Sequence, residues 1–257
     1  MKYFAILSSM PFESGKVLAL IKKVRTDKIA DKTVYSGQIS GHNVLLIASG
    51  LGKVNAAHSA TCLIENYPVN RVINIGVGGA YPGSGLKIGD IAVATKEVYG
   101  DEGVITSEGW HSLKKIGIPL VQNGKKKYFN EFLLAGSLLT RSMRQVTRHS
   151  RPQDSQTSLV TKSGPFITVS AATGSRRRAI ELEKRFNAVC ENMEGAAIAQ
   201  VCTIYNIPML EIRGISNIVG ERDKRKWNLA VASENCQDLL LKILCQGKDY
   251  HERTRAI

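Results

Sequence analysis

The chain has 257 residues, of which 35 are basic and 22 acidic, so its formal net charge is +13. Hydrophobic residues make up 43% of the sequence, which excludes a disordered chain and is enough to fill one large core. No apolar run reaches the roughly 18 residues of a transmembrane helix, and the apolar stretch Tyr3–Leu7 is too short for a signal-peptide core. We therefore expect a soluble, cytoplasmic protein with no membrane partner.

Short apolar runs alternate with amphipathic segments, which predicts a mostly parallel sheet with helices outside it. The predicted strands are Lys2–Ser8, Thr33–Ser40, Asn43–Ser49, Arg71–Ile75, Ile91–Tyr99, Phe166–Val169, Ala188–Cys190 and Pro208–Ile215. The predicted helices are Glu13–Val24, Lys53–Asn66, Glu131–Val146, Arg176–Arg185, Glu194–Tyr205 and Trp227–Leu244. Residues 101–127 lack periodicity and are expected to form a long functional loop or an interface segment. Without a repeat or a break in composition, residues 1–257 are predicted to form a single α/β domain.

The excess of positive charge lies in short runs such as Lys125-Lys126-Lys127 and Arg176-Arg177-Arg178. A basic surface attracts polyanions, but these runs contain no interleaved aromatic residues, and the chain has no zinc-finger or RNA-binding signature. Solvated faces are therefore favoured over a nucleic-acid site. The cysteines have no close pairing and the histidines no ligand spacing, so we expect free thiols, no metal and no cofactor.

Four segments with chemically useful side chains follow predicted strands, which is where ligands bind in open α/β sheets. They are Ser8–Ser14 with Glu13, the glycine-rich Asn74–Gly85, Glu191–Ala197 with Glu194, and Glu211–Asn217. Each has an ordinary explanation when taken alone: a carboxylate at a helix start, a tight turn, a helix-capping carboxylate and a polar turn. The glycine-rich segment matches neither a Walker loop nor the dinucleotide-binding pattern.

In order and spacing, the four segments resemble the nucleoside phosphorylase and nucleosidase superfamily. The similarity to its methylthioadenosine/S-adenosylhomocysteine nucleosidases is carried by Met10–Glu13, Ser49–Val54, Leu86–Asp90, Met193-Glu194 and Arg213–Asn217, along nearly the whole chain. The futalosine hydrolase branch, part of menaquinone biosynthesis, is resembled more closely still, in Ser9–Glu13, Gly78–Gly85, Tyr99–Gly103 and Gly214–Asn217. The resemblance implies a three-layer sandwich in which helices flank a central mixed, largely parallel sheet.

The resemblance also implies a role for each matching residue. Glu13 would take a proton from the water that attacks C1′ of the ribosyl group, and Glu194 would hold the sugar hydroxyls and stabilise an oxocarbenium-like transition state. The other implied substrate contacts are Met193 under the ribose, Val77 and Gly78 beside the sugar, Ser216, and Thr173 and Gly174 at the purine. Contact through Thr173 and Gly174 is expected because Val169–Ser175 lacks the phenylalanine on which adenine nucleosidases stack the base.

Asn217 is the residue that implies the base, because adenine-specific nucleosidases have an aspartate at the matching position. An asparagine amide can donate to a 6-oxo group and accept from N7–H, which fits hypoxanthine, the base of futalosine. The resemblance therefore implies a bacterial futalosine hydrolase without a cofactor. It also implies a homodimer with Tyr99–Gly103 near the shared interface.

Other functions remain open. A nucleosidase acting on methylthioadenosine, S-adenosylhomocysteine or 6-aminofutalosine would use the same fold, and so would a 6-oxopurine nucleoside phosphorylase. A phosphorylase needs cations around its phosphate, and Lys53 is the only nearby candidate, so hydrolysis is favoured. A nucleic-acid-binding protein and a binding-only relative are further alternatives. Arg222 and Lys53 are the candidates for contact with the futalosine carboxylate.

Overall fold

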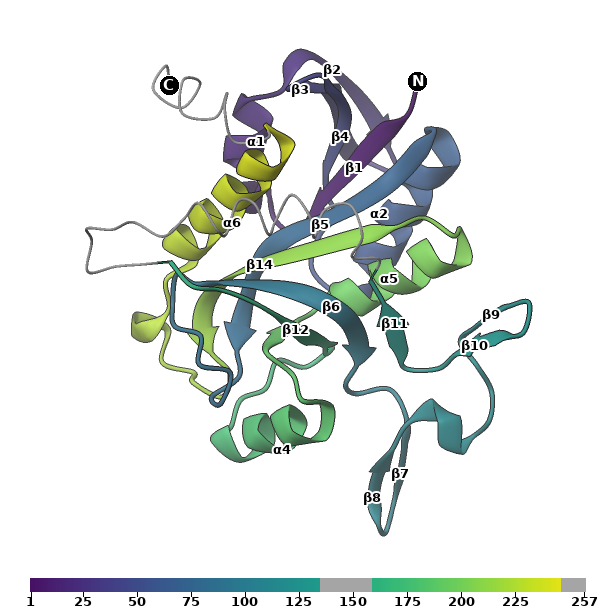
Figure 1. The fold of residues 1–257 in the computed structure, drawn as a ribbon, viewed down its shortest axis with the longest axis vertical. Helices are drawn as coiled ribbons and strands as arrows, with labels where there is room; N and C mark the ends of the chain where they lie inside the picture. The colour runs from purple at the N-terminus through teal and green to yellow at the C-terminus, as the bar shows by residue number, and fades with distance from the viewer. Residues whose placement is uncertain (135–158, 246–257) are drawn as a thin grey trace.

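A mixed ten-stranded sheet runs through the middle of the molecule (Figure 1). The computed structural model describes residues 1–134 and 159–245. At the centre of the sheet, β1 (Tyr3–Ser8) pairs in parallel with β4 (His42–Ala48) and β5 (Val69–Ala80), and β5 pairs in parallel with β14 (Met209–Ile218). The carboxyl ends of these strands therefore meet at one edge of the sheet.

The rest of the sheet mixes both directions. Strand β12 (Thr161–Thr168) lies parallel to β6 (Ile91–Tyr99) and to β13 (Cys190–Asn192). Strand β14 is antiparallel to β6, and β13 is antiparallel to β5. The outer strands β2 (Lys22–Ile29), β3 (Lys32–Ile39) and β11 (Glu131–Leu133) also pair in antiparallel fashion. The predicted mixed α/β sheet is confirmed, with its parallel pairs in the interior.

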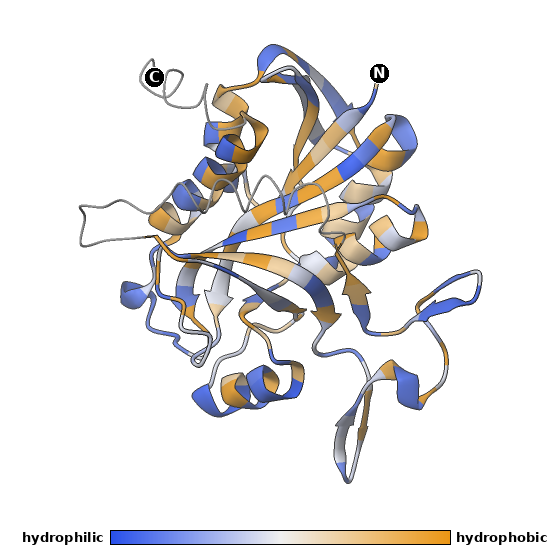
Figure 2. Cartoon of the chain, viewed as in Figure 1, coloured by the Kyte–Doolittle hydropathy of each residue, from blue (hydrophilic) through white to orange (hydrophobic). Residues whose placement is uncertain are grey.

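Helices cover both faces of the sheet, as expected of three layers. Residues on β1 alternate between two buried clusters, one on each face of the sheet. Ala5 and Leu7 pack against α2 (Lys53–Asn66) and α5 (Gly195–Ile204) on one face, whereas the side chain of Ile6 lies on the opposite face. That other face is covered by α1 (Gly15–Ala19) and α6 (Leu229–Leu244). Figure 2 shows the apolar colour concentrated on the central strands. The alternation follows from the two-residue period of a strand.

The segment 101–127 is built from short elements. Strands β7 (Val104–Thr106) and β8 (Gly109–His111) form one hairpin, and β9 (Val121–Asn123) and β10 (Lys126–Tyr128) form another. The one-turn helix η2 (Leu113–Lys115) lies between them. The expectation of a long loop is therefore replaced by two small hairpins, and the functional or interface role stays a prediction.

Two predicted helices are wrong at their ends. The predicted helix Glu13–Val24 stops early: η1 (Pro11–Glu13) and α1 are followed by the edge strand β2, which is almost wholly exposed. Pairing with β3 overrides the weak helical pattern there, and the charged side chains suit an edge strand. Residues Glu131–Leu133 form β11 rather than the start of a helix, and the remainder of that prediction beyond Leu134 falls outside the described residues.

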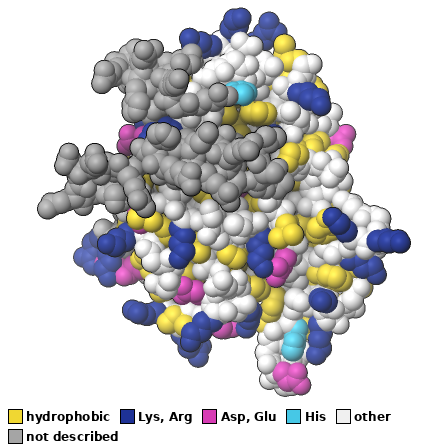
Figure 3. Space-filling model, in the orientation of Figure 1, with side chains coloured by type: hydrophobic (Ala, Val, Ile, Leu, Met, Phe, Trp, Pro, Cys, Tyr) yellow, Lys and Arg dark blue, Asp and Glu magenta, His cyan; other side chains and the backbone are white. Residues whose placement is uncertain are grey.

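The remaining helical elements are α4 (Arg176–Phe186) and η3 (Lys224–Lys226). Helix α4 packs on one end of the sheet, and η3 leads into α6. None of the helices in the described part of the chain has the length and apolar composition that a membrane crossing requires. On the face shown in Figure 3, lysine and arginine side chains are spread around the outline rather than gathered in one patch.

Candidate active site

Glu13 lies just beyond the carboxyl end of β1, and only 1% of its surface is exposed. Its Oε2 accepts hydrogen bonds from the hydroxyl of Ser9 (2.7 Å) and the backbone N–H of Met10 (2.8 Å), and its Oε1 accepts one from the backbone N–H of Val77 (2.8 Å). A carboxylate can accept about four hydrogen bonds. Glu13 is therefore held in one orientation with one acceptor position left.

Glycine at position 76 permits this arrangement. A Cβ there would lie 2.6 Å from Oε1 of Glu13 and 2.9 Å from Nη1 of Arg213, so a larger residue would push one of them away. Strand β5 was expected to end at Ile75 in a glycine-rich loop, but it continues to Ala80. Gly76, Gly78 and Gly79, which lie within β5, are needed for close approach of side chains rather than for a turn.

Glu194 lies immediately before α5, at its N-cap position, and is 4% exposed. Its Oε1 accepts a hydrogen bond from the backbone N–H of Gly52 (3.0 Å), in the loop before α2. Its Oε2 lies 3.4 Å from Nη2 of Arg213. The preceding Met193 is half-buried. Glu194 thus connects the segment after β13 with the loop before α2 and with Arg213 on β14.

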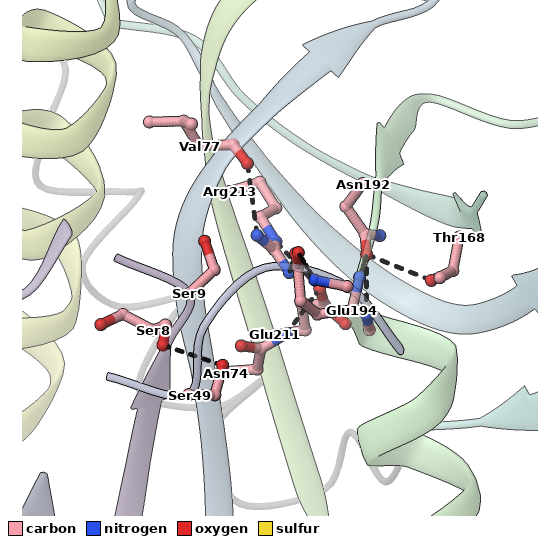
Figure 4. A network of polar contacts seen from close by, with 12 residues as sticks. Ser8, Ser9, Ser49, Asn74, Val77, Thr168, Asn192, Glu194, Glu211 and Arg213 are labelled. Carbon is pink, nitrogen blue, oxygen red and sulfur yellow. Dashed lines mark hydrogen bonds and ion pairs between the residues drawn. The ribbon is translucent and has the colours of Figure 1, made fainter. Parts of the chain in front are cut away.

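Arg213 is the cation at the centre of the site, and its side chain is 1% exposed (Figure 4). Its Nε donates to Oε1 of Glu211 (3.0 Å) and its Nη1 donates to the carbonyl of Val77 (3.2 Å). Burial opposes the charge, yet Glu211, Glu194 and Glu13 raise the pKa of Arg213 above its ordinary value. The sequence pattern predicts no role for Arg213, because a residue within a strand carries no sign in the sequence of the carboxylates that will surround it.

Ser216 and Asn217 stand near the carboxyl end of β14. The Ser216 hydroxyl lies 3.2 Å from the carbonyl of Gly78 and 2.8 Å from Oδ1 of Asn217. The Asn217 Nδ2 donates to the carbonyl of Ile218 (3.2 Å), and this side chain lies against Gly79. Each end of the Asn217 amide therefore keeps one free hydrogen-bonding position, a donor at Nδ2 and an acceptor at Oδ1.

Thr173 is held by a residue without an assigned role. Glu191 accepts hydrogen bonds from the N–H (2.9 Å) and hydroxyl (2.6 Å) of Thr173, and from the hydroxyl of Tyr81 (2.9 Å). The Thr173 N–H and hydroxyl hydrogen are thus already used, whereas Gly174 is exposed. A cavity of about 350 Å³ lies along this loop, lined by residues 169, 171–175, Asp101, Arg178 and Leu182.

Lys53 is engaged in an ion-pair cluster. Its Nζ lies 2.6 Å from Oδ1 of Asp101 and 3.1 Å from Oε1 of Glu102, and its side chain is 15% exposed. Asp101 also accepts a hydrogen bond from the N–H of Ser170 (2.5 Å). Burial works against ionisation of Asp101, but the hydrogen bonds from Lys53 and Ser170 lower its pKa overall. Lys53 therefore braces the loop at Ser170 and has its charge satisfied.

The structure brings most of the predicted site residues together. Glu13, Val77 and Arg213 are in direct contact, and Glu194 joins them through the guanidinium of Arg213. Asn217 contacts Gly79, on the same strand as Val77. Within residues 1–134 and 159–245, no group of three His, Cys, Asp or Glu side chains could hold a metal ion.

The sequence profile of the phosphorylase superfamily matches residues 3–244, and the chain belongs to this superfamily. The chain is 32% identical to a futalosine hydrolase of Thermus thermophilus over 74% of its own length and 76% of that protein. It is 29% identical to a 5′-methylthioadenosine/S-adenosylhomocysteine nucleosidase of Bacillus thuringiensis, over 93% of its own length and 97% of that protein. A methylthioadenosine/S-adenosylhomocysteine nucleosidase from Colwellia psychrerythraea, solved in complex with adenine, superposes with a TM-score of 0.78 at 26% identity, covering 96% of each chain.

Proposed function

We propose that this protein hydrolyses the N-glycosidic bond of futalosine and releases hypoxanthine, as a step of menaquinone biosynthesis. The protein is an enzyme of the nucleosidase class, which cleaves N-glycosidic bonds. The observation that carries the choice of futalosine is Asn217, whose amide offers one donor and one acceptor at the end of β14. The identity to a futalosine hydrolase supports the same choice.

Glu13 is the proposed general base. Three donors fix its carboxylate, and the remaining acceptor position can take the hydrogen of a water molecule. Proton removal as that water attacks C1′ avoids forming a free hydroxide or a protonated product oxygen. Because Val77 donates to the same carboxylate, the strand beside the sugar also sets the position of the base.

Glu194 is the proposed ribose ligand. Gly52 donates to Oε1, and Nη2 of Arg213 forms an ion pair with Oε2 without a hydrogen bond, so acceptor positions remain on both oxygens for the 2′- and 3′-hydroxyls. As the glycosidic bond stretches, positive charge develops on the sugar, and a fixed carboxylate stabilises it. We place Met193 under the ribose, with Val77 and Gly78 along its side.

Asn217 is the proposed reader of the purine. Its free Nδ2–H faces the 6-oxo group, and its free Oδ1 accepts from N7–H once N7 has taken up a proton from solvent, so that the leaving base departs neutral. Ser216 orients the amide from its Oδ1 side. Because Glu191 takes both the N–H and the hydroxyl hydrogen of Thr173, the proposed purine contacts from this loop are the two oxygens of Thr173, which can accept, and the backbone of Gly174.

Hydrolysis is favoured over phosphorolysis by the pairing of the cations. Arg213 is paired with Glu211 and Glu194, and Lys53 is paired with Asp101 and Glu102. A phosphate dianion needs cations or donors that are free to bind it. The same pairing removes Lys53 as a candidate for the futalosine carboxylate and leaves the exposed Arg222.

The second candidate is a methylthioadenosine/S-adenosylhomocysteine nucleosidase. It is favoured by the relative matched over 93% of this chain and by the neighbouring structure solved with adenine. The two candidates differ in the base released. An asparagine can meet a 6-amino group only by turning its amide, which would place Nδ2 beside the Ser216 hydroxyl and Oδ1 beside the carbonyl of Ile218.

The test is incubation of the purified protein with futalosine, 6-aminofutalosine, inosine and methylthioadenosine, each with and without phosphate. The released base is separated by chromatography and quantified. We expect hypoxanthine from futalosine at a rate that does not depend on phosphate. Faster release of adenine from methylthioadenosine would establish the second candidate, and strict dependence on phosphate would establish a phosphorylase.

A further inference from the structure

Two buried carboxyl groups, Glu97 and Glu211, meet beneath the site, and no role in the proposed reaction uses them. They lie on the antiparallel strands β6 and β14, and both are 0% exposed. A Cβ built on Gly195 would lie 2.5 Å from Oε2 of Glu211 and closer still to Oε1 of Glu97. The two carboxyl groups therefore face the same point at the start of α5.

The hydrogen bonds around the pair leave one acceptor without a donor. Glu97 accepts from the Thr168 hydroxyl (2.8 Å) at Oε2 and from Nδ2 of Asn192 (2.7 Å) at Oε1. Oε1 of Glu211 accepts from Arg213 (3.0 Å) and from Nδ2 of Asn74 (3.0 Å), but its buried Oε2 has no partner. Buried polar atoms are almost always satisfied, and two adjacent carboxylates repel.

One proton resolves both problems. If Oε1 of Glu97 carries it, the missing donor faces Oε2 of Glu211 and the pair holds a single negative charge. The electrostatics agree with this placement, because burial, together with the neighbouring Glu211, raises the pKa of Glu97 well above its usual value. Burial raises the pKa of Glu211 as well, but the charge of Arg213 opposes that effect.

We propose that Glu97 and Glu211 share a single proton and act as a positioning pair for Glu194. The inference rests on the proposed ribose role of Glu194 for its catalytic consequence only. The pair is connected to the backbone of Glu194 through Asn192. It is connected to the carboxylate of Glu194 through Arg213.

Both routes are short. Oδ1 of Asn192 accepts the N–H groups of Glu194 (2.9 Å) and Gly195 (2.7 Å), while its Nδ2 is fixed by Glu97. On the other side, Arg213 bridges Glu211 and Glu194. Figure 4 shows Asn192, Glu194, Glu211 and Arg213 gathered at this point. Glu194 is thus oriented from its main chain and from its side chain by the same pair.

None of the neighbouring titratable groups named below takes the proton from the Glu97–Glu211 pair. The titratable groups that face it are Tyr99, Cys190, Glu194, Cys202 and Arg213. Burial raises the pKa of Tyr99, Cys190 and Cys202, so these groups stay neutral. Arg213 stays cationic and compensates the negative charge.

Two substitutions distinguish the shared proton from two independent carboxylates. In Glu211→Gln, the new amide donates to Glu97 from the position of the unpartnered oxygen, so Glu97 ionises and the pair keeps one negative charge. In Glu97→Gln, an amide that donates to Glu211 places its NH2 against the NH2 of Asn192, so one buried group goes unsatisfied. We therefore expect Glu211→Gln to retain more of the wild-type stability than Glu97→Gln.

The direct measurement is infrared spectroscopy of protein labelled with ¹³C in glutamate, which identifies the carbonyl stretch of a neutral carboxylic acid. The wild-type protein at pH 7 should show this band, and both variants should lack it. The exposed Glu131→Gln is the matched control and should leave the band unchanged. A wild-type spectrum without the band, or a band that persists in Glu97→Gln or Glu211→Gln, overturns the proposal. If Glu97→Gln does not fold, Glu211→Gln alone decides.

Kinetics test the positioning role on whichever nucleoside the wild-type enzyme hydrolyses. Glu97→Gln should lower kcat by about tenfold to a hundredfold with a smaller change in KM, because a misplaced Glu194 loses contacts that strengthen in the transition state. The alkaline fall of kcat/KM that accompanies ionisation of the wild-type pair should be absent in Glu211→Gln. Unchanged kcat in Glu97→Gln refutes positioning. The spectra need no substrate, so they stand even if futalosine is not hydrolysed.

Discussion

Arg213 is the residue whose loss should cost the most stability. Arg213→Met removes the cation that lies 3.0 Å from Glu211 and 3.4 Å from Glu194, whose side chains are 0% and 5% exposed. Breaking a buried ion pair by removing one partner costs about 3–5 kcal/mol, because the remaining charge has no water to compensate it. Since a domain is stable by only about 5–15 kcal/mol in total, the variant should be close to unfolding.

The assay is urea denaturation followed by circular dichroism at pH 7. Arg225→Met is the matched control, because Arg225 also pairs with a carboxylate, Asp223, but its side chain is 90% exposed. We expect no resolvable change in the control, since water screens that pair. A loss below about 1 kcal/mol in Arg213→Met, the range of exposed pairs, would refute the reasoning.

A double variant tests the cause of the loss. Adding Glu194→Gln to Arg213→Met neutralises one of the two carboxylates left behind and keeps an oxygen that can accept from Gly52, so the double variant should be more stable than Arg213→Met. Residues in direct contact typically couple by about 0.5–3 kcal/mol. If the two losses simply add, uncompensated charge is not the reason that Arg213→Met unfolds.

Four further outcomes are expected. Glu13→Gln cannot accept the proton of the water, so kcat should fall about 10²–10⁴-fold in the base-release assay while hypoxanthine still binds; normal turnover would exclude Glu13 as the base. Asn217→Asp places an acceptor opposite the 6-oxo group, so kcat/KM for futalosine should fall about tenfold to a hundredfold and rise for 6-aminofutalosine; an unchanged ratio of the two would remove Asn217 from base recognition. The pKa of Glu97 is raised on folding, so its stabilising contribution is complete below its unfolded pKa of about 4.3 and is lost as the pH rises toward its folded pKa. The free energy of unfolding of the wild type relative to Glu97→Gln, measured in urea, should fall with pH above about 4.3. Light scattering should give the mass of a homodimer, and a monomer at micromolar concentration would contradict that expectation.

Local patterns in the sequence determined much of the sheet. The strand patterns of residues 33–40 and 43–49, separated by Gly41-His42, predict a hairpin. The structure has the hairpin with its turn one residue earlier, where Ser40 and Gly41 have the positive φ of a tight turn (47° and 83°). The apolar composition of the segments that become β1 and β14 also predicts strands, because it suits burial on both faces of a sheet.

The candidate site was only partly visible in the sequence. Glu13, Glu194 and Asn217 could be singled out because each follows a predicted strand, although Asn217 lies within β14 near its end, and strand ends meet at one edge of a parallel sheet. Their roles came from the order of the motifs, and they remain predictions. The sequence predicts Gly76 as part of a loop, whereas the close approach of Glu13 and Arg213 is what requires a glycine there.

Only the tertiary structure decided which charges meet. Glu97 lies in the middle of an ordinary strand pattern, and nothing near it in the sequence shows that Glu211 will face it from β14. The end of the predicted helix at Glu13–Val24 was decided in the same way, by pairing of β2 with β3. Strand pairing is non-local, so its free energy depends on partners that residue patterns along the chain do not contain. The sequence therefore determined which residues could act at the strand ends, and the packing of β6 and β14 determined how their charges are balanced.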